Sequence, residues 1–397
     1  MRTGIATVPL DYGRCPRWLF ERMKKLSRGI IISIVEEFGP EELLKRFSDP
    51  IWFQSLGCVI GFDWNSSGLT TTTLGAVKAT LFDIQDRLGI YVCGGKGKTS
   101  RKTPEEINTY GISRGFQFSD DLIYASKMAA KVDSSLIQNI QTPFQLYQHN
   151  FIFTKSGHWA VIQQGMAPQL QQARRYHWLS DKIKDFIEEP HAGIVSDIRT
   201  KPLNLTAKES SKNRKISTEL VNEEPKTFLK NIKLIQRTQK NHSFNKRSLV
   251  EEKEKLKKVI KKEKFGNLTL MELKDVEFYW HPVIEEKFDL KRLEKTIFFA
   301  NEQKPKNFEK LLALKGIGPK TIRALSLVSE IIYGAKPSYE DPARYSFAHG
   351  GKDFTPFPVD RKIYDQTLEI MEKGIKRSRI SIREKFEAQR RLNSVSL

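Results

Sequence analysis

The sequence feature that most constrains the fold is a short glycine-containing turn between two helical patterns near the C-terminus. Leu311, Leu312 and Leu314 close the first pattern, and Lys-Gly-Ile-Gly-Pro-Lys follows at positions 315–320. Glycine permits the positive φ angles of a tight turn, and proline suits the first position of a helix because its missing N–H needs no partner there. Apolar residues then recur at three- and four-residue intervals as far as Ile332. The stretch therefore predicts a helix-hairpin-helix.

The chemistry of such a turn follows from its backbone. The first N–H groups of the second helix have no partner within the helix, and they lie at the positive end of the helix dipole, so a phosphate fits there. We expect a nucleic-acid backbone to be bound without sequence preference, and the alternative is an ordinary helical corner. The candidate binding residues are Lys315, Gly316, Gly318, Lys320, Thr321 and Arg323.

The composition of the whole chain also favours a nucleic-acid partner. The 397 residues include 67 basic and 47 acidic side chains, a net charge of +20. Charge does not distinguish DNA, the expected partner, from RNA. No apolar run approaches the roughly 20 residues of a membrane span, so no membrane partner is expected. The three cysteines are far apart and suggest neither a zinc module nor a disulfide framework, which fits a reducing cytoplasm.

Composition divides the chain into three parts and predicts an α+β fold. Residues 1–200 are expected to form a mixed α/β domain, with helices at 17–38 and 40–47 and a β-hairpin that turns at 155–157. Residues 201–264 contain 19 basic and 8 acidic side chains, a net charge of +11, and predict a basic, partly disordered linker that is disordered at 207–224. Residues 265–397 are expected to form an all-α helix-hairpin-helix domain that ends in one long helix.

A glycine-rich basic loop follows a predicted strand at 89–93. The loop at 94–102 lacks the spacing of a nucleotide-binding P-loop, so we do not expect ATP to bind. It is interpreted either as an anion-binding nest or flexible basic finger on a nucleic-acid backbone, or as a solvated loop tip. Its basic residues are Lys96, Lys98, Arg101 and Lys102.

The N-terminal domain also contains polar residues that could form an enzyme site. Carboxylates and imidazoles near the ends of predicted elements could hold Mg²⁺ or Mn²⁺ for phosphodiester hydrolysis, although their spacing matches no nuclease signature. Each histidine is alternatively a structural or surface residue. The candidates are Asp133, His149, His177, Glu189 and His191, with Arg174 and Arg175 as a possible phosphate clamp.

Two residues resemble the catalytic pair of the helix-hairpin-helix base-excision DNA glycosylases. Lys320 follows the second hairpin glycine by two residues, and Asp360 stands in Pro-Val-Asp-Arg at 358–361. The resemblance implies that the lysine attacks the sugar C1′ and that the aspartate supports the charged transition state after the base is flipped out. The separation of 40 residues is longer than in those enzymes. In non-catalytic hairpins the same lysine contacts phosphate, and Asp360 could simply cap the last helix.

A second resemblance covers nearly the full length of the chain. Segments such as Tyr-Val-Cys-Gly-Gly-Lys-Gly-Lys at 91–98 and Phe-Ala-His-Gly-Gly-Lys at 347–352 are similar to the prokaryotic family catalogued as domain of unknown function 763. Further similar segments lie at 2–6, 63–68, 159–166 and 173–178. The resemblance implies an archaeal or bacterial protein, cytoplasmic and nucleoid-associated, without an established activity.

Together these features predict a DNA-binding protein that acts in DNA repair or processing. A metal-dependent nuclease and a base-excision glycosylase/lyase are the enzymatic alternatives.

Overall fold

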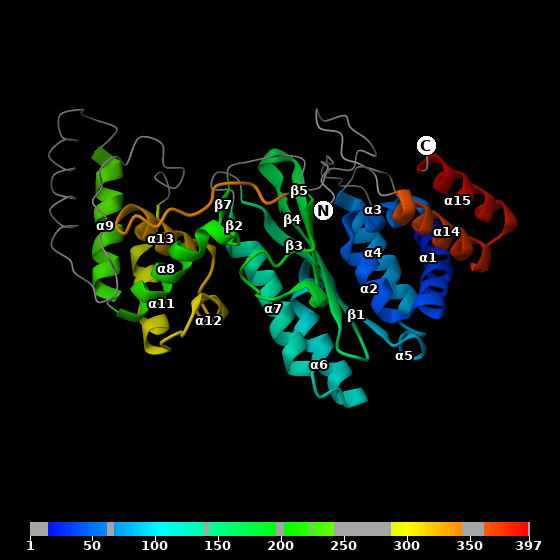
Figure 1. The fold of residues 1–397 in the computed structure, drawn as a ribbon, viewed down its shortest axis with the longest axis horizontal. Coiled ribbons are helices and arrows are strands. Elements are labelled where there is room, and N and C mark those ends of the chain that lie inside the picture. The colour runs from blue at the N-terminus through cyan, green and yellow to red at the C-terminus, as the bar shows by residue number, and fades with distance from the viewer. Residues whose placement is uncertain are drawn as a thin grey trace.

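The computed structural model describes residues 15–61, 67–138, 143–195, 202–223, 225–241, 287–343 and 361–395. The fold is α+β, as the sequence predicts. An antiparallel sheet stands at the centre of the molecule, with one group of helices to its right and another to its left in Figure 1.

The central sheet has five strands, and every neighbouring pair is antiparallel. The predicted hairpin is confirmed, because Phe153 pairs with Trp159 across the turn at 155–157. Both faces of the sheet are buried: Phe151 points into one core and Ile152 into the other. In spatial order the strands are β1 (Ile90–Lys96), β3 (Gln145–Thr154), β4 (Trp159–Ala167), β5 (Gln172–Leu179) and β6 (Gly193–Val195).

One face of the sheet is covered by the N-terminal helices. These are α1 (Arg17–Phe38), α2 (Pro40–Ser48), α3 (Pro50–Val59) and α4 (Ser67–Leu81), and the short α5 (Gln85–Leu88) leads into β1. The helices predicted at 17–38 and 40–47 are confirmed. Gly39 separates them at φ 86°, a conformation that favours glycine, and Pro40 opens α2.

The C-terminal helices α14 (Arg361–Arg377) and α15 (Ile382–Val395) return to these N-terminal helices instead of joining the hairpin. Gly29 of α1 and Gly374 of α14 let the two helices approach closely. A Cβ atom on Gly374 would lie 2.6 Å from the Cα atom of Ile30, and one on Gly29 would lie 2.6 Å from the Cα atom of Ser378. Met371 and Ile375 of α14 are buried in the core that α1 and α4 share. The expected domain at 265–397 with one long final helix is therefore corrected: the end of the chain forms two helices that belong to the N-terminal core.

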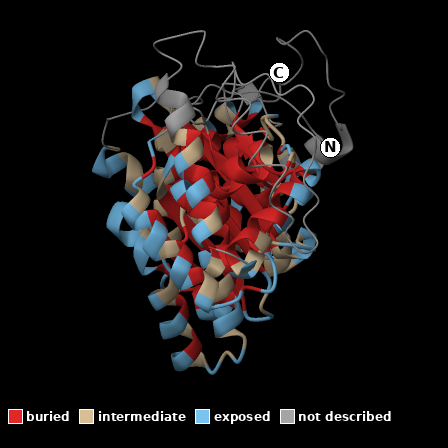
Figure 2. Cartoon of the chain, turned by 90° about the vertical axis from the view of Figure 1, so that its left-hand side faces the viewer, coloured by how far each residue is buried: buried red, intermediate tan, exposed pale blue. Residues whose placement is uncertain are grey.

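The other face of the sheet is covered by α6 (Thr103–Arg114) and α7 (Ser119–Ser135), which follow the 3-10 helix η1 (Gly97–Lys102). The core beneath α7 continues without a break into a second group of helices. Buried residues form a continuous interior in the side view, and the exposed residues lie on the outer faces of the helices (Figure 2). The second group comprises α8 (Ser211–Glu223), α9 (Pro225–Asn241), α11 (Leu290–Glu302), α12 (Phe308–Ala313) and α13 (Pro319–Ile331).

The structure corrects the expectation of disorder at 207–224. Ile216, Leu220 and Val221 of α8 are buried, as are Phe228 and Ile232 of α9. The stretch contains few aromatic residues, but its apolar residues recur at helical spacing and pack against α11 and α13. Residues 202–223 and 225–235 therefore contribute to the core, and residues 201, 224 and 242–264 of the predicted linker lie outside the described residues.

The remaining elements are short. β2 (Ile137–Gln138) and β7 (Leu203–Asn204) pair as a two-stranded sheet, and the further 3-10 helices are η2 (Pro168–Leu170), η3 (Ser180–Lys182) and η4 (Lys208–Ser210). Across the described ranges, no helix combines the length and apolar character needed to cross a bilayer.

Candidate nucleic-acid interface

Two helices and a tight turn lie where the sequence predicts them. Helix α12 ends at Ala313, and the chain turns through Gly316, whose φ angle is 88°. Helix α13 begins at Pro319, after Gly318 as the N-cap residue. A serine, threonine or aspartate at the N-cap would cover the first N–H groups with a side-chain oxygen, whereas glycine has none to offer. The start of α13 is therefore a helix N-terminus without a side-chain cap from its own N-cap residue.

The surface of this turn carries part of the predicted set of residues. The residues Lys315, Gly316 and Lys320 are exposed, and Gly318 is half-buried. Thr321 and Arg323, by contrast, are buried, with 7% and 6% of their surface accessible. The structure thus places two lysines at the turn and turns the other two predicted side chains inward.

Helix α7 contacts the end of α12 and the start of the turn through Lys131. The Nζ atom of Lys131 donates to the backbone carbonyls of Leu312, Ala313 and Leu314, at 2.7, 3.0 and 2.7 Å. These carbonyls lie at the end of α12, where the helix dipole favours a positive charge. Partial burial lowers the pKa of Lys131. The sequence offers no signal for this contact, because Lys131 is about 180 residues from its partners.

Two further contacts join α7 and the segment after it to the hairpin. The side-chain amide of Gln138 donates to the carbonyl of Pro319, the first residue of α13, at 3.3 Å. The hydroxyl of Tyr124 donates to the carboxylate of Glu309 in α12, and the ammonium of Lys310 lies 4.9 Å from the centre of the Tyr124 ring. The hairpin is therefore held on the sheet domain at both of its helices.

Helix α11 lies next to the turn. A Cβ atom on Gly316 would lie 3.9 Å from the Cγ2 atom of Thr296, which is in the middle of α11. Arg292 and Lys295 are exposed on this helix. They add positive charge beside the two lysines of the turn.

The predicted glycine-rich loop at 94–102 divides in the structure: residues 94–96 end β1, and residues 97–102 form η1. Gly94 has a φ angle of 85°, and a Cβ atom there would lie 2.1 Å from the carbonyl oxygen of His149, so only glycine fits. The Lys78 ammonium donates to the carbonyl of Gly94, and the N–H of Gly94 donates to the Glu106 carboxylate, each at 2.8 Å. The four basic side chains are exposed, as both interpretations of the loop expect: Lys96, Lys98, Arg101 and Lys102.

The two arginines predicted as a phosphate clamp are buried in β5, with 1% and 2% of their surface accessible. Arg174 forms an ion pair of 2.7 Å with Asp341 and lies over the ring of Phe144. Arg175 is on the opposite face of the strand, where it donates to the side chain of Gln54, and burial lowers its pKa to about 9. Neither side chain is placed to bind a phosphate from solvent, so the prediction of a phosphate clamp at Arg174 and Arg175 is wrong.

Three of the five candidate catalytic residues converge in a buried network between α7 and the sheet. The carboxylate of Asp133 contacts the ring of His191 and accepts from the indole of Trp178 at 3.0 Å. The side-chain amide of Gln163 donates to the same carboxylate, and its oxygen accepts from Nδ1 of His149 at 2.6 Å. Burial lowers the pKa of His149. The chain of contacts ends at the Ser126 hydroxyl, 3.0 Å from Nε2 of His149.

The other two candidates lie apart from this network. His177 points to the opposite face of β5, where its Nδ1 donates to the carbonyl of Phe47 at 2.9 Å, and burial holds its pKa well below the usual value. Glu189 is exposed on the loop before β6. Alternation along β5 explains the separation of His177, because successive side chains point to opposite faces. Among the described residues, no three His, Cys, Asp or Glu side chains are grouped so that they could hold a metal ion.

The second glycosylase-like residue, Asp360, lies outside the described residues. Its distance from Lys320 is therefore not defined, and the proposed catalytic pair stays a prediction.

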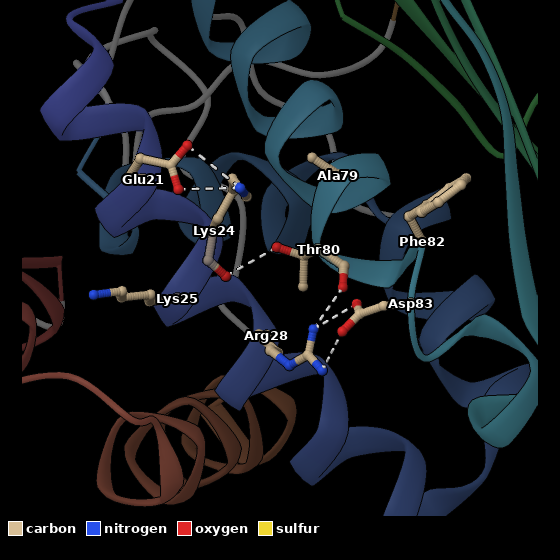
Figure 3. Close-up of a pocket in the computed structure, with 8 residues that line it drawn as sticks. All are labelled: Glu21, Lys24, Lys25, Arg28, Ala79, Thr80, Phe82 and Asp83. Atoms are coloured by element: carbon tan, nitrogen blue, oxygen red, sulfur yellow. Dashed lines mark hydrogen bonds and ion pairs between the residues drawn. The ribbon is translucent and has the colours of Figure 1, made fainter.

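A surface hollow between α1 and α4 also carries basic residues (Figure 3). Arg28 donates to both oxygens of Asp83, at 2.7 and 2.9 Å, and the Lys24 ammonium lies 3.0 Å from the Glu21 carboxylate. Carboxylates neutralise these two cations, and Lys25 is the third basic residue that lines the hollow.

The class defined by this fold is an α+β protein in which a tight turn flanked by lysines joins two short helices. The chain belongs to the DUF763 family of proteins of unknown function, whose family model matches residues 4–359. No curated protein and no solved structure matches it.

Proposed function

We propose that this protein binds DNA by its phosphate backbone, at the turn between α12 and α13. The observation that carries the proposal is the start of α13: Gly318 provides no capping side chain, and Lys315 and Lys320 are exposed around it. Backbone N–H groups at a helix N-terminus bind phosphate oxygens, and flanking lysines add charge without reading base sequence.

The rigidity of the turn supports this function. Lys131 binds three backbone carbonyls at the turn, so the turn has its conformation before a ligand binds. A preformed site avoids the entropic cost of ordering a loop upon binding. The net charge of +20 adds a long-range attraction to any polyanion.

The buried polar network gives a metal-dependent nuclease no support. Asp133 and His191 bond to each other and to Trp178 and Gln163, and no group of metal ligands forms within the described ranges. Lys320 is exposed at the turn, where a phosphate contact uses its charge and a lyase would use its amine as a nucleophile. We also propose that the protein acts in DNA repair or processing, in the cytoplasm and in association with the nucleoid.

Salt-dependent binding tests the proposal. Affinity for labelled duplex DNA should fall steeply with salt, and a Lys315→Ala/Lys320→Ala double variant should bind more weakly with a log–log slope smaller by about 1.8, or about 0.9 for each lost phosphate contact. Lys25→Ala, a change at an exposed lysine of α1, is the control and should leave the slope unchanged. An affinity independent of salt, or a double variant equal to the control, would refute phosphate binding at the turn. Stronger binding to an RNA duplex of the same sequence would reassign the partner.

The same samples separate binding from catalysis. Incubation with magnesium or manganese tests for cleavage, and incubation of abasic DNA with chelator and borohydride tests for a covalent adduct. Lys320→Arg keeps the charge but removes the amine nucleophile. An adduct in the wild type that is lost in Lys320→Arg would assign lyase chemistry, whereas equal duplex binding by the two proteins without an adduct supports backbone binding alone.

A further inference from the structure

Helix α11 exposes an aromatic side chain beside the turn. Phe299 has 40% of its surface accessible, although the opposite side of the helix, formed by Leu293, Ile297 and Ala300, is buried. A single exposed phenylalanine is common on protein surfaces and carries no meaning by itself. What distinguishes Phe299 is its position relative to the turn and to exposed basic side chains.

The geometry of α11 places Phe299 next to the turn. Thr296 is the α11 residue that Gly316 approaches, with 3.9 Å between a Cβ atom on that glycine and the threonine methyl group. Phe299 follows Thr296 by three residues and Arg292 precedes it by four, so both lie on the same side of the helix as Thr296. Phe298 is two residues from Thr296 and therefore faces another direction, with a similar exposure of 36%.

Charge around Phe299 is suited to a nucleic-acid strand. Lys295 is exposed one helical turn before Phe299, and Arg292 is exposed two turns before it. Lys315 is exposed next to Gly316, the glycine that approaches Thr296. Glu302, three residues after Phe299, is the acidic neighbour on this side of the helix. An aromatic ring between basic side chains is the arrangement that binds unpaired nucleotides, in which bases stack on the ring and phosphates contact the cations.

We infer that Phe299 stacks on an unpaired base of a DNA strand whose phosphates are held at the turn. The inference rests on the proposed backbone binding and extends it to a substrate class: single-stranded DNA, or duplex with an unpaired or flipped nucleotide. In an intact duplex each base is stacked between its neighbours, so its face is not available to the ring. Phe299 therefore contributes to single-strand binding and not to duplex binding.

The test compares the full-length wild type with Phe299→Ala, Phe299→Tyr and Phe298→Ala. Fluorescence anisotropy measures the affinity of each protein for labelled oligothymidylate and for a labelled duplex at one salt concentration. Phe299→Ala should lose about 5- to 140-fold of its single-strand affinity, the range for one stacked base, and should keep its duplex affinity within about twofold. Phe299→Tyr retains a stacking ring and should bind as the wild type does. Phe298→Ala removes an equally exposed ring that faces elsewhere and should also bind normally.

A strand that carries 2-aminopurine reports the stacking itself. Its fluorescence should be quenched by the wild type and by Phe299→Tyr, and less so by Phe299→Ala. Equal single-strand affinities for Phe299→Ala and Phe298→Ala would overturn the inference, as would an equal loss on single strand and duplex, which would indicate damage to the fold. If the wild type binds duplex in a salt-dependent manner but is insensitive to Phe299, only the stacking inference fails. If the wild type binds neither DNA, the proposed function fails with it.

Discussion

Replacement of Lys131 by methionine should loosen the hairpin without unfolding the rest of the molecule. The change keeps an unbranched side chain of similar length and removes the ammonium that binds the carbonyls of Leu312, Ala313 and Leu314. Because the contact joins α7 to the end of α12, we expect its loss to act on the local opening of α12 and α13.

The expected magnitude follows from these three bonds. A hydrogen bond with a charged partner contributes about 1.5–3 kcal/mol, and a cation at a helix C-terminus contributes up to about 2 kcal/mol in partly buried geometry. The three bonds share one ammonium, whose burial carries a desolvation cost, and water can reach the turn at the exposed Lys315 once the ammonium is gone. We therefore expect a net loss of about 2–3 kcal/mol, less than the sum of three separate bonds.

Native-state amide hydrogen exchange measures this quantity locally. Peptides that cover residues 308–331 should exchange about 30- to 140-fold faster in Lys131→Met than in the wild type, which corresponds to 2–3 kcal/mol. Peptides from α1 and α4 should not change. Lys127→Met, a substitution one helical turn earlier at an exposed lysine, is the matched control and should change exchange by less than about 0.5 kcal/mol. Equal exchange in the two variants would refute the view that Lys131 braces the turn.

Two further predictions concern the buried interior. Asp133→Ala should destabilise the fold by about 3–5 kcal/mol, because it leaves the buried donors of Trp178 and Gln163 without their acceptor. The midpoint of urea unfolding measures this loss, with Asp121→Ala, a change at an exposed aspartate of the same helix, as the control. Equal midpoints for the two variants would contradict the prediction. Gly374→Ala should separate α14 from α1 at a cost of about 1–3 kcal/mol, because its Cβ atom would overlap the α1 backbone, and α14 and α15 should then be cleaved faster by a protease. Gly75→Ala, whose Cβ atom would meet its nearest neighbour at 3.7 Å, is the control and should be neutral or stabilising. Equal proteolysis of the two variants would argue against close packing of α1 and α14.

Local sequence determined the elements whose signals are complete within a few residues. The boundaries of α1 and α2 follow from Gly39 and Pro40, which end one helix and start the next. The β3–β4 hairpin and the turn between α12 and α13 are likewise specified by short turn sequences between apolar runs. These elements could be predicted because glycine and proline restrict the backbone at the position where they occur.

The positions of charged side chains could not be read in the same way. Arg174 and Arg175 look like an exposed basic pair in the sequence, but they lie in a strand with helices on both faces, so each is buried on a different side. Asp133 and His191 are 58 residues apart and meet only because α7 and the loop before β6 pack on one face of the sheet. Of the candidate site, the exposed lysines of the turn could be predicted, and their support by Lys131 could not.

The sequence by itself determined the turn chemistry, the amphipathic helices and the excess of positive charge, because these depend on neighbouring residues or on composition. The tertiary structure alone decided which helices share a core. It placed α14 against α1 through Gly29 and Gly374, brought α8 and α9 into the hairpin's core, and set Lys131 on the carbonyls of α12. The physical reason is that these contacts join residues far apart in the chain, so they form only when surfaces from several elements are buried together.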